Sequence, residues 1–212
     1  MYVLFDLDDT LVHSDAVREA FAIVGGEHGI GAEVLQATLD ALPGRPALEV
    51  FRGLGLSGAT ARAACKRFFT ALDELNDRVP TVAYPDADTV VRELAARGST
   101  LILSTGSSPD RARRVLEQEG WDAFQVVLGS DRECAKGHAH YDRIASEHAD
   151  GGWVRDAVTI GDSPADMRLG AEHGVPVRIG IDRDGDPQSL LAAGATHVVR
   201  TLADILPIVA AA

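Results

Sequence analysis

The sequence contains little cysteine. Only Cys65 and Cys134 occur among its 212 residues, and their spacing matches no metal-binding motif. Disulfide-stabilised domains and structural zinc sites are built on several cysteines at characteristic spacings. The sequence therefore suggests neither a disulfide framework nor a zinc site.

Basic residues are also in short supply. Twenty Lys and Arg side chains face 32 Asp and Glu side chains, which gives a formal net charge of −12. Proteins that bind nucleic acid neutralise phosphates with Lys and Arg, so this balance argues against DNA, RNA and anionic membranes as partners. An anionic substrate would need local positive charge to overcome the overall field.

Long apolar runs are absent as well. Nothing approaches the run of about 20 apolar residues that a membrane helix needs. The first five residues lead directly into Asp6, without a basic segment or a small-residue cleavage site. We therefore expect a cytoplasmic, reduced protein with no membrane partner.

Short apolar runs recur along the chain, and each ends in small or acidic residues. Runs of four or five residues rich in Val, Ile and Leu are typical of strands that are buried on both faces. Helical patterns separate the later runs, and this alternation predicts right-handed crossovers in a parallel sheet. The predicted strands are residues 2–5, 100–103, 125–128, 157–160, 175–179 and 197–199. The predicted helices between and after them are residues 87–97, 109–119, 137–148, 164–173 and 202–210.

The segment after the first strand breaks this alternation. Its pattern is helical throughout, with breaks at Gly25-Gly26, Pro43-Gly44 and the 53–58 stretch. The four helices predicted there are residues 16–28, 32–42, 47–54 and 59–78. We therefore predict a doubly wound, Rossmann-like α/β core formed by residues 1–13 and 82–212. The helical domain of residues 14–81 is inserted into it.

Polar residues follow the predicted strands where a ligand site is expected. Doubly wound sheets bind their ligands outside the carboxyl ends of the strands. The residues at these positions are Asp6, Asp8 and Asp9 after the first strand, Ser104, Thr105 and Gly106 after the second, Lys136 after the third, and Asp162 and Asp166 after the fourth. Their convergence predicts one pocket rich in carboxylates, with one lysine.

These residue types together suit phosphoryl transfer. A phosphate ester repels a carboxylate nucleophile unless a cation such as Mg²⁺ neutralises its oxygens, and Asp6 and Asp162 could bind that ion. Asp6 could attack phosphorus, while Asp8 acts as general acid and then as general base. Lys136 would supply positive charge. Thr105 or the adjacent Ser104 would bind phosphate oxygens together with backbone N–H groups near Gly106.

The ordered motifs resemble those of the haloacid dehalogenase superfamily. They are Asp6-Leu7-Asp8-Asp9-Thr10-Leu11, Thr105, Lys136 and Gly161-Asp162-Ser163-Pro164-Ala165-Asp166. The resemblance implies that Asp6 is the nucleophile, that Asp8 is the acid/base and that Thr105 and Lys136 bind phosphate. It also implies Mg²⁺ ligands at Asp6, Asp162, Asp166 and the backbone carbonyl of Asp8.

The resemblance also points to one subgroup of this superfamily. Asp8 favours phosphate esters over haloacids, and a helical cap is similar to that of the phosphoglycolate phosphatase and β-phosphoglucomutase group. Arg45, on the predicted cap loop, is a candidate ligand for a substrate carboxylate or second phosphate. Asp9 and His13 stand where the group more often has glycine and an acid.

The predicted activity is hydrolysis of a small phosphorylated metabolite. A mutase that returns the phosphate to a sugar, and a binding module with a vestigial site, remain alternatives. The sequence leaves open both the identity of the ester and the choice between monomer and homodimer. Two other patterns are not interpreted as metal sites. The 182–186 loop lacks the acid that a calcium loop requires at its twelfth position, and His138 and His140 are predicted to point to different faces of a helix.

Overall fold

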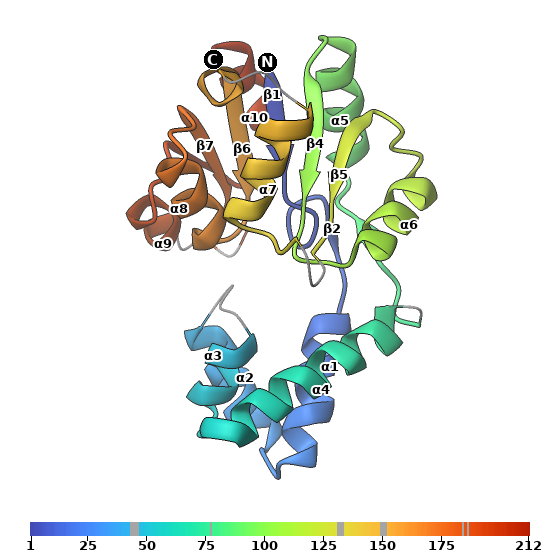
Figure 1. Ribbon diagram of the computed structural model, residues 1–212, viewed down its shortest axis with the longest axis vertical. Helices are drawn as coiled ribbons and strands as arrows, with labels where there is room; N and C mark the ends of the chain where they lie inside the picture. The colour runs from blue at the N-terminus through green and yellow to red at the C-terminus, as the bar shows by residue number, and fades with distance from the viewer. Residues whose placement is uncertain (43–46, 77, 131–133, 149–151, 184, 186) are drawn as a thin grey trace. The chain divides into compact units, whose positions relative to one another are not determined.

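The chain forms two compact units. The computed structural model describes residues 1–42, 47–76, 78–130, 134–148, 152–183, 185 and 187–212. One unit combines Met1–His13 with Val82–Ala212, and the other is Ser14–Thr81 (Figure 1). The first unit is α/β and the second is helical in its described residues, so each is considered by itself.

A parallel sheet of six strands forms the centre of the first unit. Its strand order is β5-β4-β1-β6-β7-β8, with parallel pairing between all neighbours (Figure 1). The strands are β1 (Tyr2–Phe5), β4 (Thr100–Ser104), β5 (Phe124–Leu128), β6 (Ala157–Gly161), β7 (Val177–Ile181) and β8 (His197–Val199). The chain runs outward from β1 to β5 and then returns to β6 on the other side. This places a topological switch point beside β1, where such sheets bind ligands.

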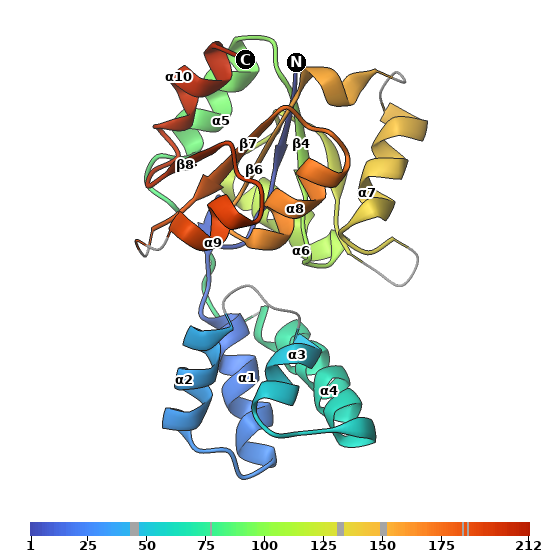
Figure 2. The same ribbon diagram turned by 90° about the vertical axis from the view of Figure 1, so that its left-hand side faces the viewer.

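Helices cover both faces of this sheet (Figure 2). Alternation along β1 explains the two layers, because Val3 and Phe5 pack into one hydrophobic cluster and Leu4 into another. The first cluster includes side chains of α5 (Ala87–Ala96), α6 (Pro109–Glu119) and α10 (Ile205–Ala210). The opposite face is covered by α7 (His138–Arg143), α8 (Pro164–Glu172) and α9 (Pro187–Ala192). None of the helices in the described ranges is long and apolar enough to cross a membrane.

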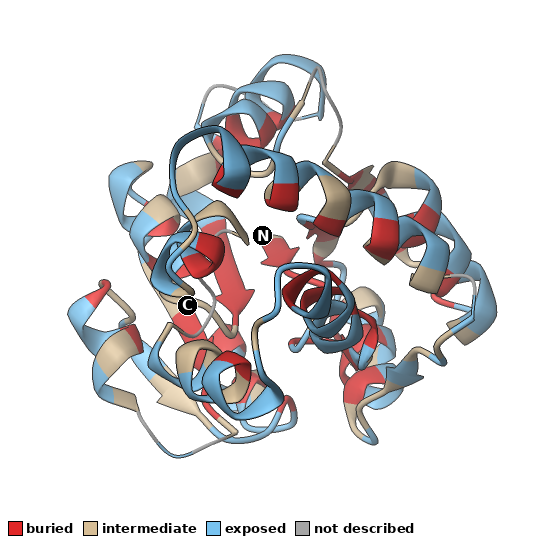
Figure 3. Cartoon of the chain, turned by 90° about the horizontal axis from the view of Figure 1, so that it is seen from below, coloured by how far each residue is buried: buried red, intermediate tan, exposed pale blue. Residues whose placement is uncertain are grey.

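The helical unit has its own hydrophobic core. Phe21, Phe51 and Phe68 form an aromatic cluster in which the Phe21 and Phe68 ring centroids lie 4.3 Å apart. The helices are α1 (Ala16–Glu27), α2 (Ala32–Ala41), α3 (Ala47–Gly53) and α4 (Gly58–Asn76). In Figure 3 the helices carry buried positions on one side and exposed positions on the other, as amphipathic packing requires. The predicted fold class, a doubly wound α/β core with a helical insertion, is confirmed.

The two segments that connect the units pair with each other. β2 (Val12–His13) and β3 (Val82–Ala83) form a short antiparallel ladder, with Val12 opposite Ala83. Tyr84 continues this contact, since its backbone N–H donates to the Leu11 carbonyl at 3.0 Å. The Arg183 guanidinium lies 3.5 Å from the centre of the Tyr84 ring. The sequence did not predict this ladder, because strands of two residues have no readable periodicity.

Several element boundaries differ from the predictions. The strand predicted at residues 175–179 is β7, Val177–Ile181, because Pro176 cannot donate to a ladder and Val175 is buried without belonging to the strand. The helix predicted at residues 137–148 is α7 followed by a π-helical turn, η1 (Ile144–His148). The helix predicted from residue 202 begins at Ile205, since Asp204 accepts hydrogen bonds from the Thr201 backbone and hydroxyl. Helix α9 and the 3₁₀ turn η2 (Trp153–Asp156) were not predicted.

Candidate functional site

Asp6 follows the central strand directly. Its side chain is 10% exposed, and its Oδ1 accepts a hydrogen bond from the Leu7 backbone N–H at 2.8 Å. The chain then turns sharply, with the Asp9 N–H donating to the Val12 carbonyl at 2.7 Å. Asp9 has a φ of +56°, in the left-handed region that favours glycine and admits aspartate better than most residues. This backbone geometry explains how Asp9 fits where the resembling group more often has glycine.

Asp162 and Asp166 follow the neighbouring strand β6. Thr10 donates its hydroxyl hydrogen to Asp162 Oδ1 at 3.0 Å, which joins this segment to the loop after β1. Ser163 is the N-cap of α8, and its hydroxyl donates to Asp166 Oδ2 at 2.6 Å. A Cβ atom on Gly161 would lie 2.6 Å from that same Asp166 oxygen. A glycine is therefore required here for Asp166 to lie against the strand end.

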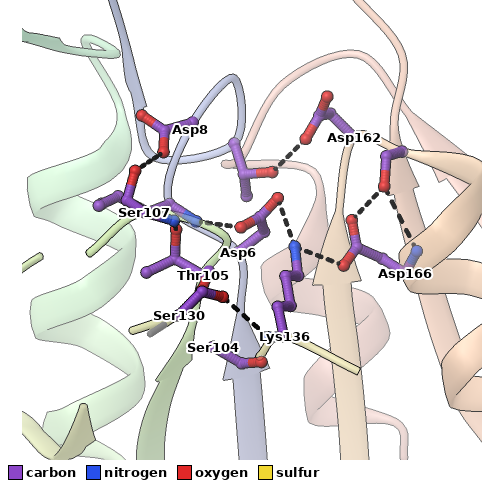
Figure 4. Close-up of polar contacts among 12 residues, drawn as sticks. Asp6, Asp8, Ser104, Thr105, Ser107, Ser130, Lys136, Asp162 and Asp166 are labelled. Carbon is purple, nitrogen blue, oxygen red and sulfur yellow. Dashed lines mark hydrogen bonds and ion pairs between the residues drawn. The ribbon is translucent and has the colours of Figure 1, made fainter. Parts of the chain in front are cut away.

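Lys136 bridges two of these carboxylates (Figure 4). Its Nζ lies 2.8 Å from Asp6 Oδ2 and 2.8 Å from Asp166 Oδ1. The Ser130 hydroxyl fixes the backbone nearby, because it accepts from the Lys136 N–H at 2.8 Å and donates to the Thr105 carbonyl at 2.9 Å. Ser130 thus connects the segment after β5 to the loop after β4.

The loop after β4 contains two candidate hydroxyls that face different partners. Thr105 is fully buried, and its Oγ1 accepts from the Ser107 N–H at 3.0 Å, so its own hydrogen is left to donate. The Ser104 hydroxyl lies 2.8 Å from His140 Nδ1. Gly106 has no atom within 4 Å of the position that a Cβ would occupy. The Ser104 hydroxyl is thus already paired with His140, whereas no acceptor for the Thr105 hydroxyl hydrogen is found among the described residues.

Asp8 turns toward the start of α6. Its Oδ2 accepts from the Ser107 hydroxyl at 2.6 Å, as Figure 4 shows, and its Oδ1 lies 2.7 Å from Arg111 Nη1. The Arg111 side chain is only 5% exposed, whereas that of Asp8 is 31% exposed. The Asp8 carboxylate is therefore held from one side and reaches solvent on the other.

Burial dominates the electrostatics of the carboxylate cluster. It raises the pKa of Asp6 to about 7, although the nearby Lys136 ammonium acts in the opposite direction. Burial also raises the pKa of Asp162 well above its usual value, and the Asp6 and Asp166 carboxylates add to the rise. For Lys136, burial alone would lower the pKa, but Asp6 and Asp166 outweigh it and raise the pKa. Burial thus favours the neutral forms of Asp6 and Asp162 in the metal-free protein.

We predict that ionisation of Asp6 destabilises the metal-free protein as the pH rises. The folded chain keeps the Asp6 proton up to about pH 7, whereas the unfolded chain releases it near pH 4. The folded state therefore binds more protons between these values, so the free energy of unfolding falls as the pH rises through this window. Urea unfolding with chelator present, at several pH values, would measure the fall.

The Asp6→Asn variant is the matched control, because Asn cannot ionise. The free energy of unfolding of the variant, minus that of the native chain, should increase from about pH 4 to about pH 7. A difference that stayed constant over this range would show that Asp6 ionises in the folded protein as it does in the unfolded one.

Three of the carboxylates lie close enough together to bind one metal ion. Oxygens of Asp6, Asp162 and Asp166 all lie within 4.8 Å of one another. A donor set of carboxylate oxygens suits a hard cation such as Mg²⁺. The residues present therefore fit the ion that the motifs imply. Asp8 does not join this set through its side chain, which faces Ser107 and Arg111.

Three polar residues of the site were given no role from the sequence, and one predicted site residue cannot be compared with the structure. Ser107, Arg111 and Ser130 were given no role at the site from the sequence. Arg111 lies in the first turn of α6, and Ser107 lies just before the N-cap Ser108. Arg45 lies outside the described residues. The other predicted residues surround the carboxyl ends of β1, β4 and β6: Asp6, Asp8, Thr105, Gly106, Lys136, Asp162 and Asp166.

Comparisons with known proteins identify the family of the chain. The profile of the haloacid dehalogenase-like hydrolases matches residues 1–174. A phosphoglycolate phosphatase of Rhodospirillum rubrum is 31% identical over 196 residues, which cover 82% of this chain and 77% of that protein. A phosphoglycolate phosphatase of Cereibacter sphaeroides is 31% identical over 139 residues, or 61% of this chain. The chain spans only 62% of the length of that relative.

Solved structures share the fold over the whole chain. A predicted phosphatase from Clostridium acetobutylicum has a TM-score of 0.83 at 21% identity, and the match covers 100% of this chain and 98% of that one. A haloacid dehalogenase-like family protein from Streptococcus pneumoniae has a TM-score of 0.79 at 21% identity, with 98% and 97% covered. The resemblance read from the motifs is thus confirmed, and the chain belongs to the haloacid dehalogenase-like hydrolase family.

Proposed function

We propose that the protein is a Mg²⁺-dependent phosphomonoester hydrolase that acts through a phosphoaspartyl intermediate on Asp6. The observation that carries this proposal is the Lys136 ammonium, 2.8 Å from both Asp6 and Asp166, within a cluster of three carboxylates. A phosphate group that enters this cluster would meet a nucleophile and a cation held in fixed positions. The relatives named phosphoglycolate phosphatase support a small phosphorylated acid as the substrate.

Two carboxyl groups divide the chemistry between them. The Asp6 carboxylate attacks phosphorus, and the bond from phosphorus to the leaving oxygen breaks while Asp8 gives that oxygen a proton. Asp8 then takes a proton from water, which attacks the phosphorus and releases Asp6 and inorganic phosphate. The Leu7 N–H holds the Asp6 carboxylate at 2.8 Å and so limits its rotation before attack.

The remaining site residues bind the phosphate and a cation. Lys136 and the Thr105 hydroxyl would bind phosphate oxygens, together with the backbone around Gly106. Asp6, Asp162 and Asp166, with the Asp8 carbonyl, would hold Mg²⁺. When bound, this ion would neutralise negative charge and orient the phosphate oxygens.

The helical unit would act as a cap that controls access and specificity. The chain leaves the α/β unit after β2 and re-enters it at β3, and these two strands of that unit pair with each other. A cap that closes during attack would exclude water from the phosphoryl group, and one that opens would release the product. We propose that Arg45, which lies outside the described residues, takes part in substrate recognition, because a guanidinium suits a substrate carboxylate.

A panel of phosphate esters tests the proposed activity. The panel would contain 2-phosphoglycolate, hexose phosphates and nucleoside monophosphates, each incubated with Mg²⁺ and assayed for inorganic phosphate and for isomeric products. We expect release of inorganic phosphate, fastest from a small phosphorylated acid. Isomer formation from a hexose phosphate without phosphate release would instead indicate a mutase. Binding of esters without any conversion would indicate a non-catalytic module.

A further inference from the structure

Arg111 is a buried cation at the site that the steps above do not use. It lies on α6, two residues after the first residue of that helix, and its side chain is 5% exposed. Its Nη1 contacts Asp8 Oδ1 at 2.7 Å, Asp8 Oδ2 at 3.0 Å and the Ser107 hydroxyl at 2.7 Å. Ser107 in turn donates to Asp8 Oδ2 at 2.6 Å. The three side chains form a closed triangle of short contacts.

This triangle restricts a side chain that would otherwise rotate. Asp8 stands on the loop after β1, and 31% of its side chain is exposed. Contacts to both carboxylate oxygens, made by Arg111 of α6 and by Ser107 just before the N-cap of that helix, limit rotation about both side-chain bonds. Arg111 suits this task, because its planar guanidinium stays charged and is pre-organised for carboxylate. A buried guanidinium also needs such a partner, since an unpaired buried charge is costly.

We propose that Arg111, with Ser107, is a positioning residue that holds Asp8 where it exchanges protons with the leaving group and with water. The proposal rests on the proposed phosphatase function, in which Asp8 is the acid/base. Arg111 stays protonated throughout and touches neither proton. It contributes by keeping the Asp8 carboxyl within reach of the leaving oxygen, where a displacement of about 1 Å costs on the order of 10²-fold in rate.

The dependence of kcat/KM on the leaving group distinguishes a positioning role of Arg111 from a purely structural one. An alkyl phosphate such as 2-phosphoglycolate expels a basic alkoxide and depends on a well-placed proton donor. The p-nitrophenyl ester expels a weakly basic phenolate and needs little protonation. The ratio kcat/KM covers the steps from free enzyme and ester to phosphoryl transfer onto Asp6, and it excludes the later water attack that both esters share. A loss of acid catalysis therefore lowers kcat/KM for the alkyl ester selectively.

The experiment compares these two esters across a set of variants. Arg111→Met should lower kcat/KM for 2-phosphoglycolate by on the order of 10²-fold and that for p-nitrophenyl phosphate by much less. Arg111→Lys should restore part of the loss, and Ser107→Ala should give a smaller loss with the same selectivity. The control is Arg113→Met, the same change on the same helix at a side chain that is 60% exposed.

A double variant tests whether Arg111 acts through Asp8. The losses of Arg111→Met and Asp8→Asn should be strongly non-additive, because each removes the same proton transfer. Equal losses of kcat/KM on both esters, or additive losses in the double variant, would overturn the role proposed for Arg111. The proposed phosphatase function would still stand if turnover depended on Asp6. If the native chain turned over neither ester, both the role of Arg111 and the proposed phosphatase function would be contradicted. If Arg111→Met does not fold, the same comparisons decide the question with Arg111→Lys and Ser107→Ala.

Discussion

The Asp6→Asn variant should release inorganic phosphate at least about 10³-fold more slowly than the native chain, because Asn has no carboxylate to attack phosphorus. The size of the effect follows from the position of Asp6, 2.8 Å from Lys136 at the end of the central strand. Other polar side chains of the cluster already have partners: Lys136 and Ser163 both contact Asp166, and Thr10 contacts Asp162. We would measure single-turnover phosphate release with enzyme in excess.

The matched control for this prediction is Asp110→Asn. Asp110 lies in the first turn of α6 with its side chain 87% exposed, so the same chemical change there should leave turnover unaltered. Asp6→Asn should also remain folded, since burial favours the neutral form at this position. A folded Asp6→Asn protein that kept a tenth or more of the native rate would rule out Asp6 as the nucleophile.

Removal of Mg²⁺ should have the second largest effect. With chelator present we expect turnover to fall by about 10²-fold or more, which corresponds to several kcal/mol of transition-state stabilisation. The reason is that Asp6, Asp162 and Asp166 lie around Lys136 as the one cation shown to contact them among the described residues, so their ionised forms need a further cation. Added Mg²⁺ should restore activity and also raise the thermal stability of the folded protein. The expected gain is about 2.7 kcal/mol when the ion is at 100 times its Kd.

The variant Asp162→Asn separates metal binding from the nucleophile. It should shift both the Mg²⁺ dependence of activity and the Mg²⁺-induced stabilisation to higher ion concentrations, because it removes one of the three carboxylates. Sodium chloride at matched ionic strength controls for charge screening. Turnover that depended on Asp6 but resisted chelator would contradict the role assigned to the ion.

The parallel sheet was predictable because each buried strand is a short, continuous apolar run. β1 and β8 agree with the predicted residues, since their bounds coincide with changes in polarity along the chain. β7 was shifted by two residues because Val175 is buried without pairing, and burial alone does not distinguish a strand from a packed turn. The β2–β3 ladder was missed because it joins residues about 70 positions apart, and nothing local to either segment signals the partner.

The same distinction applies to the site: residues that follow strands were predictable, and residues placed by tertiary contacts were not. Asp6, Asp162 and Lys136 follow strands, so the topology of the fold was enough to bring them together. Arg111 contacts Asp8 from within a helix. The Ser130 hydroxyl contacts the backbone of Thr105 and of Lys136. Such residues depend on the three-dimensional path of neighbouring loops rather than on a strand end, and their residue types also occur throughout protein surfaces.

The most direct test of the account is to trap the phosphorylated enzyme. The native chain would be mixed with 2-phosphoglycolate and Mg²⁺, quenched in acid within one turnover and digested with trypsin, which releases residues 1–18 as one peptide. Fragmentation of this peptide should place a phosphoryl group on Asp6, and the Asp6→Asn peptide should carry none. A phosphoryl group on another residue, or rapid turnover with no phosphorylated peptide at any quench time, would contradict the phosphoaspartyl mechanism.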